Sequence, residues 1–218
     1  MSIKRIFGRL TLALAVAGFA AIAHAEVTVA YITNGNTNEG WTLINGGAEA
    51  AAKKAGVKFI KLAAEKGELS KQLAIVEDMI TRKVSAIAIA PVDSAGIAPA
   101  VNKALAAGIP VIAVDTGITG AKITSYVATD NIKAAQVQGD WAAGQIKDGD
   151  TVIYVTGDLS QSTGRERKDG FVAGLNAKRK NVKIVEVPTT WDQTMAQNGV
   201  EAALRSNPGA KFLACAWD

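Results

Sequence analysis

The sequence predicts an α/β protein made of two lobes, each a doubly wound parallel sheet. Three observations support this class. Short, β-rich apolar runs alternate with segments of helical periodicity. Several of the runs are apolar throughout, which is typical of parallel strands covered on both faces. Their starting points recur roughly every 25 to 31 residues, the length of one strand-helix unit.

Seven segments carry the strand pattern. They are Val27–Thr33, Val57–Leu62, Ser85–Ala90, Pro110–Asp115, Thr151–Thr156, Val182–Val187 and Lys211–Ala216. The segments between them have helical periodicity. Apolar residues at Leu69, Leu73, Val76 and Ile80, and again at Ile97, Val101 and Leu105, each form one helix face.

The alternation is interrupted once, between Thr116 and Thr129. This segment is rich in Gly and Thr and is too short for a crossover helix and a strand, although residues 125–128 could form a short extra strand. A fresh alternation then begins with a helix, for which Asp130 and Asn131 are the expected N-caps. We therefore expect a first lobe over residues 26–129 and a second over residues 130–218.

The N-terminus has the features of a secretory signal peptide. Three basic residues (Lys4, Arg5, Arg9) precede a 13-residue apolar run over 10–22, and Ala23-His24-Ala25 follows. Thirteen helical residues would reach about 20 Å, short of the roughly 30 Å of a bilayer core, so a membrane anchor is the weaker alternative. We predict that residues 1–25 are cleaved and that the mature protein is periplasmic.

The C-terminus ends without the expected crossover helix. The strand over 211–216 is followed by Trp217 and Asp218 alone. A strand without its covering helix exposes apolar surface to water, which costs about 25 cal/mol of free energy per Å². The sequence therefore predicts that the second lobe is incomplete and the chain truncated; a short natural terminus is the alternative.

Composition excludes several classes of function. Of 24 basic residues three lie in the predicted signal peptide, so 21 remain against 20 acidic ones, and a nucleic-acid partner is not expected. The sole His, His24, leaves with that peptide, and Cys215 is the sole Cys. A Ser-His-Asp triad and a Cys- or His-ligated metal site are thereby excluded. Phosphate-binding motifs are absent, so we expect no cofactor.

Candidate binding residues follow the predicted strands, because ligands of open α/β sheets bind beyond the carboxyl ends of the strands. Three of the four Trp residues (Trp41, Trp191, Trp217) fall there, whereas Trp141 lies inside a predicted helix and is expected to pack. Core packing is the alternative for each of the three. Together they suit a pocket that stacks on the C–H faces of a carbohydrate.

Two charged residues are the strongest polar candidates. Asp115 directly follows a buried strand, where a carboxylate needs donors such as ligand hydroxyls; a turn or capping role is the alternative. Ser162 or Thr163 is expected to cap the next helix, which places Arg165 and Arg167 near a helix N-terminus that disfavours cations. Of the two, Arg165 is the predicted ligand-binding residue, and a solvated surface arginine is the alternative.

Taken together, the residues resemble the periplasmic sugar-binding proteins of ABC importers, the ribose-binding type, over nearly the whole mature sequence. The resemblance is carried by Asn38 and Trp41 after the first strand and by four further segments. These are Ala90-Pro91-Val92-Asp93-Ser94, the run from Ile109 to Asp115, Thr129-Asp130-Asn131, and Gly164-Arg165-Glu166-Arg167 before Gly170-Phe171.

The resemblance implies a periplasmic binding protein fold of class I and a set of sugar contacts. Asn38 and Asp115 would bind sugar hydroxyls from the first lobe and Arg165 from the second, while Trp41 and Trp191 would sandwich the ring. The sequence departs from the ribose-binding pattern at four positions: Gly40, Ala90, Thr116 and Trp217. A different pentose, a hexose or a polyol is therefore as well suited as ribose. The family is also about a third longer, with segments that complete both lobes.

We accordingly expect a monomeric solute-binding protein, not an enzyme, that closes on a sugar or polyol and delivers it to an ABC transporter permease. A periplasmic sensory receptor signalling to chemotaxis or a histidine kinase is the alternative. A periplasmic enzyme using carboxylates such as Asp115 and Asp192 is a third reading, but no nucleophile elbow supports it.

Overall fold

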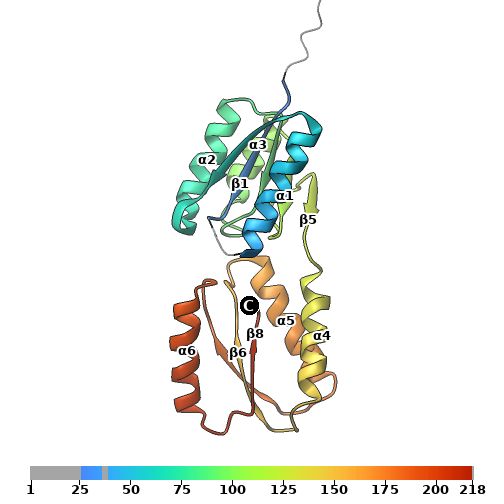
Figure 1. Cartoon of the computed structure of the whole chain (residues 1–218), viewed down its shortest axis with the longest axis vertical. Helices are drawn as coiled ribbons and strands as arrows, with labels where there is room; N and C mark the ends of the chain where they lie inside the picture. The colour runs from blue at the N-terminus through green and yellow to red at the C-terminus, as the bar shows by residue number, and fades with distance from the viewer. Residues whose placement is uncertain (1–25, 36–38, 218) are drawn as a thin grey trace, which may run out of the picture.

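The structure, a computed structural model, describes residues 26–35 and 39–217. Two parallel sheets, each with helices packed against it, stack end to end along the long axis of the molecule (Figure 1). The predicted α/β class with two parallel-sheet lobes is confirmed. The predicted signal peptide, residues 1–25, lies outside the described residues.

The first sheet has five parallel strands in the order β2-β1-β3-β4-β5. Its strands are β1 (Thr28–Thr33), β2 (Lys58–Ala63), β3 (Ala86–Ile89), β4 (Val111–Val114) and β5 (Ser125–Val127). The helices that connect them are α1 (Glu39–Ala55), α2 (Leu69–Thr81) and α3 (Ala98–Ala106), with a short 3-10 turn at Glu65–Gly67. The possible extra strand over residues 125–128 is therefore present as β5.

The second sheet has three parallel strands in the order β7-β6-β8. They are β6 (Thr151–Val155), β7 (Lys183–Val187) and β8 (Phe212–Cys215), and the helices are α4 (Asn131–Ala143), α5 (Ser162–Asn176) and α6 (Gln193–Ser206). In the described chain the backbone passes from the first sheet to the second once, between β5 and α4 (Figure 1).

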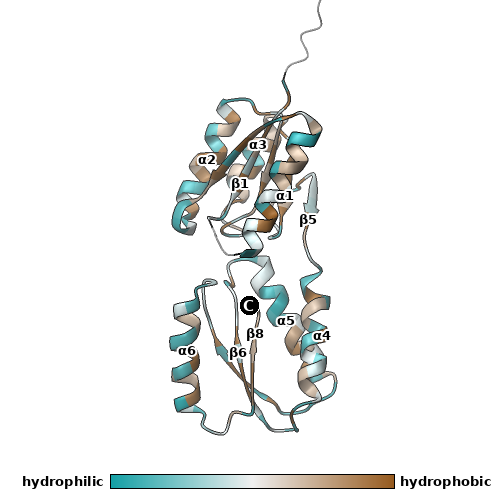
Figure 2. Ribbon diagram, viewed as in Figure 1, coloured by the Kyte–Doolittle hydropathy of each residue, from teal (hydrophilic) through white to brown (hydrophobic). Residues whose placement is uncertain are grey.

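Each sheet has its own hydrophobic core. The first contains Ile32, Ile87, Ile89 and Val111 from the strands, packed against α2 and α3. In the second lobe, the ring of Tyr154 on β6 stacks on that of Phe171 on α5 with 4.3 Å between centroids. Figure 2 shows the hydrophobic residues concentrated in the strands. Four consecutive residues of β6 are buried, and coverage of both faces explains why this strand is apolar along its length.

Helices α4 and α5 pack unusually close because glycines line their contact. A Cβ atom at Gly139, Gly170 or Gly174 would lie 2.1 to 2.3 Å from a carbonyl oxygen of the facing helix. Such distances leave no room for a side chain. The close packing fixes α5, which carries several residues that face the first lobe.

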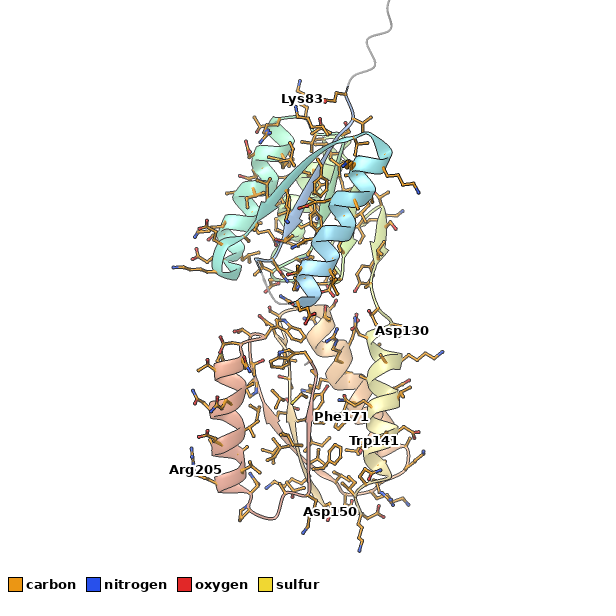
Figure 3. All side chains as sticks on the ribbon, in the orientation of Figure 1. Lys83, Asp130, Trp141, Asp150, Phe171 and Arg205 are labelled. Carbon is orange, nitrogen blue, oxygen red and sulfur yellow. The ribbon has the colours of Figure 1, made fainter. Side chains whose placement is uncertain are left out.

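The helix caps differ in part from the prediction. Asp130 lies at the start of α4 (Figure 3) and is its N-cap as expected, since its carboxylate accepts a hydrogen bond from the Lys133 N–H. The prediction that Ser162 or Thr163 caps α5 is wrong: the N-cap is Gln161, without a side-chain cap bond. Both hydroxyls are instead bonded to the first lobe.

The prediction that Trp141 packs against the protein is confirmed only in part. Its ring lies against Phe212 with 5.7 Å between centroids, but 61% of the residue is exposed on α4 (Figure 3). Within residues 26–35 and 39–217, no helix combines the length and apolarity needed to span a bilayer.

Candidate functional site

A cavity of about 570 Å³ lies between the two lobes. Its lining includes Asn34, Trp41 and Asp115 from the first lobe, and Thr163, Arg167, Trp191 and Trp217 from the second. Asn34 and Asp115 follow β1 and β4, and Trp191 and Trp217 follow β7 and β8. The carboxyl ends of strands in both sheets thus face the same space, as the general rule for open α/β sheets requires.

Asp115 occupies a strained backbone position directly after β4. Its φ is +63°, a left-handed conformation that is uncommon for a residue other than glycine. The Thr116 hydroxyl donates to Asp115 Oδ2 over 3.0 Å. Because Thr116 Oγ1 donates there, its 2.7 Å hydrogen bond with Thr163 Oγ1 is donated by Thr163. A chain of two hydroxyls therefore connects α5 of the second lobe to the carboxylate of the first.

The electrostatics of Asp115 reflect its burial. Desolvation raises the pKa of its carboxyl above the ordinary 3.8, while the Thr116 hydrogen bond and the positive charge of Arg167 lower it. Burial and the nearby Asp115 carboxylate together raise the pKa of Tyr31 to about 12. The carboxylate is thus a partly desolvated acceptor, which gains from additional donors.

Trp191 is held in place by contacts on several sides. Its φ is +63°, and its backbone N–H donates to Thr189 Oγ1. Its ring contacts that of Trp217 edge-on, with 5.4 Å between centroids. A Cβ atom at position 157 would lie 2.0 Å from the indole, so Gly157 is required for the ring to lie over this backbone. The indole therefore forms one wall of the cavity.

Arg167 supplies a cationic group on the same side. Its Nε donates to Asn131 Oδ1 over 2.9 Å, one Nη donates to the Ala216 carbonyl over 2.8 Å, and its Cζ lies 5.6 Å from the centre of the Trp191 ring. A guanidinium has five N–H donors. These two hydrogen bonds use two of the five N–H donors, so the guanidinium keeps donors for a ligand.

Four of the six predicted site residues line this cavity together: Trp41, Asp115, Trp191 and Trp217. Asn38 lies outside the described residues. Arg165 does not line the cavity. One of its Nη atoms donates to the carbonyls of Leu159 and Ser160, at 2.8 and 2.9 Å, and so fastens the segment that precedes α5.

Of the two neighbouring arginines on α5, Arg167 lines the cavity, whereas the sequence predicts Arg165 as the binding residue. Helical periodicity could have separated them, because Arg167 is four residues from both Thr163 and Phe171 and shares their face of α5. Thr163 and Phe171 are buried. Arg165 is two residues from Thr163 and therefore points to the opposite side of the helix.

Direct hydrogen bonds join the lobes beside the cavity. The Gly117 N–H donates to Ser162 Oγ, and the Ser162 N–H donates to Ser94 Oγ, both over 2.8 Å. The Ser94 N–H also donates to the Ser160 carbonyl over 3.2 Å. The start of α5 is thus bonded to the segments that follow β3 and β4.

In the described part of the chain, no group of three or more His, Cys, Asp or Glu side chains could hold a metal ion. The cavity instead combines a carboxylate acceptor, a guanidinium donor and three indole rings. This set matches an uncharged polyhydroxy compound, which offers hydroxyls at its rim and C–H groups on its faces.

Comparison with known proteins agrees with this chemistry. The family model described as periplasmic binding protein domain matches residues 29–218. The ribose import binding protein of Escherichia coli is 29% identical over 213 residues, which cover 98% of this chain and 71% of that protein. The D-ribose/D-allose-binding protein of Pseudomonas aeruginosa is 30% identical over 204 residues, covering 87% and 63%.

Solved structures show the same fold. An ABC transporter solute-binding protein from Burkholderia graminis in complex with D-arabinose superposes with a TM-score of 0.81 at 28% identity, covering 88% of this chain and 66% of that one. A periplasmic solute-binding protein from Actinobacillus succinogenes with bound D-allose gives 0.77 at 29% identity, covering 88% and 70%.

Proposed function

The chain belongs to the periplasmic binding protein domain family, and from this premise we propose that it is the sugar-binding component of an ABC importer. The observation that carries the proposal is the cavity between the lobes, to which the first lobe contributes Asp115 and the second Arg167. The similar proteins are named for ribose and allose binding and, in solved structures, hold arabinose and allose. Those names denote binding proteins, and the chain is not an enzyme.

Each lobe has a defined part in the proposed site. Asp115 accepts hydrogen bonds from sugar hydroxyls, and Arg167 donates to sugar oxygens from the other side. Trp41, Trp191 and Trp217 pack on the apolar faces of the ring. Asn38 remains a proposed first-lobe contact on the basis of the sequence resemblance.

Ligand binding and lobe closure are linked in this proposal. A ligand shifts a conformational equilibrium only by its differential affinity for the two states. A sugar that contacts Asp115 and Arg167 at once gains both interactions only when the lobes are together. Hinge closure of this kind is known for periplasmic binding proteins.

The proposal includes the cellular setting expected from the sequence. Residues 1–25 act as a cleaved signal peptide, the mature protein works in the periplasm as a monomer, and the closed form docks on the permease of the importer. The proposed ligand is a pentose, a hexose or a polyol. We assign Arg165 a role in fastening the loop before α5 rather than in sugar binding.

Isothermal titration calorimetry against D-ribose, D-allose and D-arabinose tests the proposal. We expect saturable one-site binding of at least one of them, weakened strongly in Asp115→Ala. Asp78→Ala, on the exposed face of α2, is the matched control and should bind as the wild type does. Absence of binding to all three sugars, or equal binding by Asp115→Ala, would contradict the proposal.

A further inference from the structure

Gln161 is buried at the junction of the lobes and has a hydrogen-bond partner on each side. Its Nε2 donates to the Val92 carbonyl of the first lobe over 3.1 Å, and its Oε1 accepts from the Trp191 indole Nε1 over 2.9 Å. The residue is 5% exposed. It therefore lies between the first lobe and the aromatic wall of the cavity.

The chemistry of its two partners allows one orientation of the Gln161 amide. A backbone carbonyl can only accept, and an indole N–H can only donate. Once the NH₂ end is bonded to Val92, the oxygen must face Trp191. The position of the first lobe thus determines which end of the amide meets the indole.

The Val92 carbonyl of the first lobe is held in place by hydrogen bonds of its own segment. Gln72 on α2 is fully buried; its Oε1 accepts from the Val92 N–H over 2.8 Å, and its Nε2 donates to the Ala90 carbonyl over 2.8 Å. The segment after β3 is therefore fixed to α2, and the Val92 carbonyl has a defined place when the lobes meet.

Trp191 lines two cavities in the cleft. A second cavity of about 390 Å³ is lined by Lys66, Asp158 and Asp192 and shares Asn34, Gln161 and Trp191 with the first cavity. Because the ring borders both cavities, a change in the tilt of the Trp191 indole would change the shape of the first cavity. A residue that orients this ring therefore affects which ligands fit the first cavity.

We propose that Gln161 is a positioning residue that couples contact between the lobes to the orientation of the Trp191 indole. When the first lobe approaches, the Val92 carbonyl binds the amide NH₂ and turns its oxygen to the indole. The ring is then fixed at the geometry in which it packs on the ligand. This inference rests on the proposed sugar-binding function and adds a residue that does not itself need to touch the sugar.

The first test measures the Trp191 indole in the ligand-free protein. The protein has four Trp residues, so four indole N–H resonances are expected in a ¹⁵N spectrum, and Trp191→Phe assigns the relevant one. In Gln161→Met the Trp191 resonance should move upfield, because the indole loses its acceptor. Gln197→Met, on the exposed face of α6, is the control and should leave it unchanged.

The second test uses Gln161→Glu and the pH dependence of sugar affinity. A carboxylate accepts from Trp191 but repels the Val92 carbonyl, so affinity at pH 7.5 should fall roughly tenfold. A protonated Glu side chain can donate to Val92 and accept from Trp191, so affinity should recover in acid. Gln161→Met should lose affinity at every pH.

Other titratable groups line the two cavities beside Gln161, so the wild type is titrated in parallel. They are Glu39, Lys66, Asp115, Asp158, Arg167 and Asp192. D-ribose, D-allose and D-arabinose are the probes, and circular dichroism confirms that each variant is folded.

The outcomes separate the two proposals. An unchanged Trp191 resonance in Gln161→Met, or a Gln161→Glu affinity that follows the wild-type pH profile, overturns the positioning role. If none of the three sugars binds the wild type, the proposed function fails, and the ligand-free resonance then decides on Gln161 alone.

Discussion

At the residue scale, Asp115 combines three costs: a left-handed backbone, partial burial and a charge. Each opposes folding, and strain of this kind is concentrated at functional sites. The compensation visible in the structure is the hydroxyl chain from Thr163 through Thr116 and the nearby charge of Arg167. A ligand hydroxyl would add a further donor.

Asp115→Asn should raise the thermal stability of the ligand-free protein at neutral pH. A carboxyl whose pKa is raised in the folded state destabilises the fold when it is ionised. The cost is absent below the ordinary pKa of 3.8 and develops as the pH rises through the raised value. The stability advantage of the variant should therefore shrink in acid, which thermal unfolding at several pH values measures.

The same variant should bind sugar about tenfold more weakly, because a charge-assisted hydrogen bond is replaced by a neutral one. Calorimetry with the sugar that binds the wild type measures this loss. A variant that is both less stable at neutral pH and unchanged in affinity would be inconsistent with the role assigned to Asp115.

Arg165 and Arg167 should separate in a paired experiment. Arg167→Ala is expected to weaken sugar binding by about 10- to 100-fold, since a hydrogen bond from a charged group contributes about 1.5–3 kcal/mol. Arg165→Ala leaves the carbonyls of Leu159 and Ser160 without this donor and should lower stability by about 1 kcal/mol with a smaller effect on affinity. Calorimetry and urea unfolding of both variants provide the comparison; the reverse pattern would restore Arg165 as the binding residue.

At the element scale, the spacing of α4 and α5 places Arg167. Asn131 begins α4 and accepts from Arg167 Nε, so the arginine depends on the distance between the two helices. That distance is set where Gly170 meets the Ile132 carbonyl. The helix pair thus supports the proposed binding site even though most of it lies away from the cavity.

Gly170→Ala should destabilise the protein by about 3 kcal/mol, because its Cβ would lie 2.3 Å from a carbonyl oxygen. Gly47→Ala is the matched control. It lies on the exposed face of α1 with nothing within 4 Å of an added Cβ, and it should gain about 0.5–1 kcal/mol. Urea unfolding measures the free energy of unfolding of both variants. Equal effects would show that the contact between α4 and α5 tolerates a methyl group.

Elements were more predictable from the sequence than contacts. The strands and their carboxyl ends follow from apolar runs, and three Trp residues and Asp115 were located by this rule alone. The choice between Arg165 and Arg167 required the direction of a helix face. The roles of Gln161 and Gly157 required the position of the Trp191 ring, which depends on chain segments far apart in the sequence.

At the scale of the whole molecule, the lobes touch through their own hydrogen bonds. The contacts from Ser94, Gly117 and Ser162 connect the segments after β3 and β4 to the start of α5. A bond made only while the lobes are together stabilises the closed state. The chain therefore contributes to closure alongside the proposed ligand.

Ser162→Ala should weaken ligand binding by about tenfold or less. It removes the acceptor of the Gly117 N–H, worth about 1 kcal/mol, and so lowers the closed population that binds sugar tightly. Ser206→Ala, at the exposed end of α6, is the control. Affinity and the small-angle scattering radius of gyration should change together in Ser162→Ala; an unchanged affinity would mean that this bond does not contribute to closure.

The contact between Gly157 and Trp191 has a consequence for how such a pocket can diverge. Because an added methyl group at 157 would overlap the indole, a substitution there is tolerated only after residue 191 has become smaller. The two positions are epistatic, and the order of mutations matters. Gly157→Ala is tolerated after Trp191→Ala, but in the presence of the indole it is not. Combinatorial libraries aimed at new sugar preferences should therefore vary these two codons jointly.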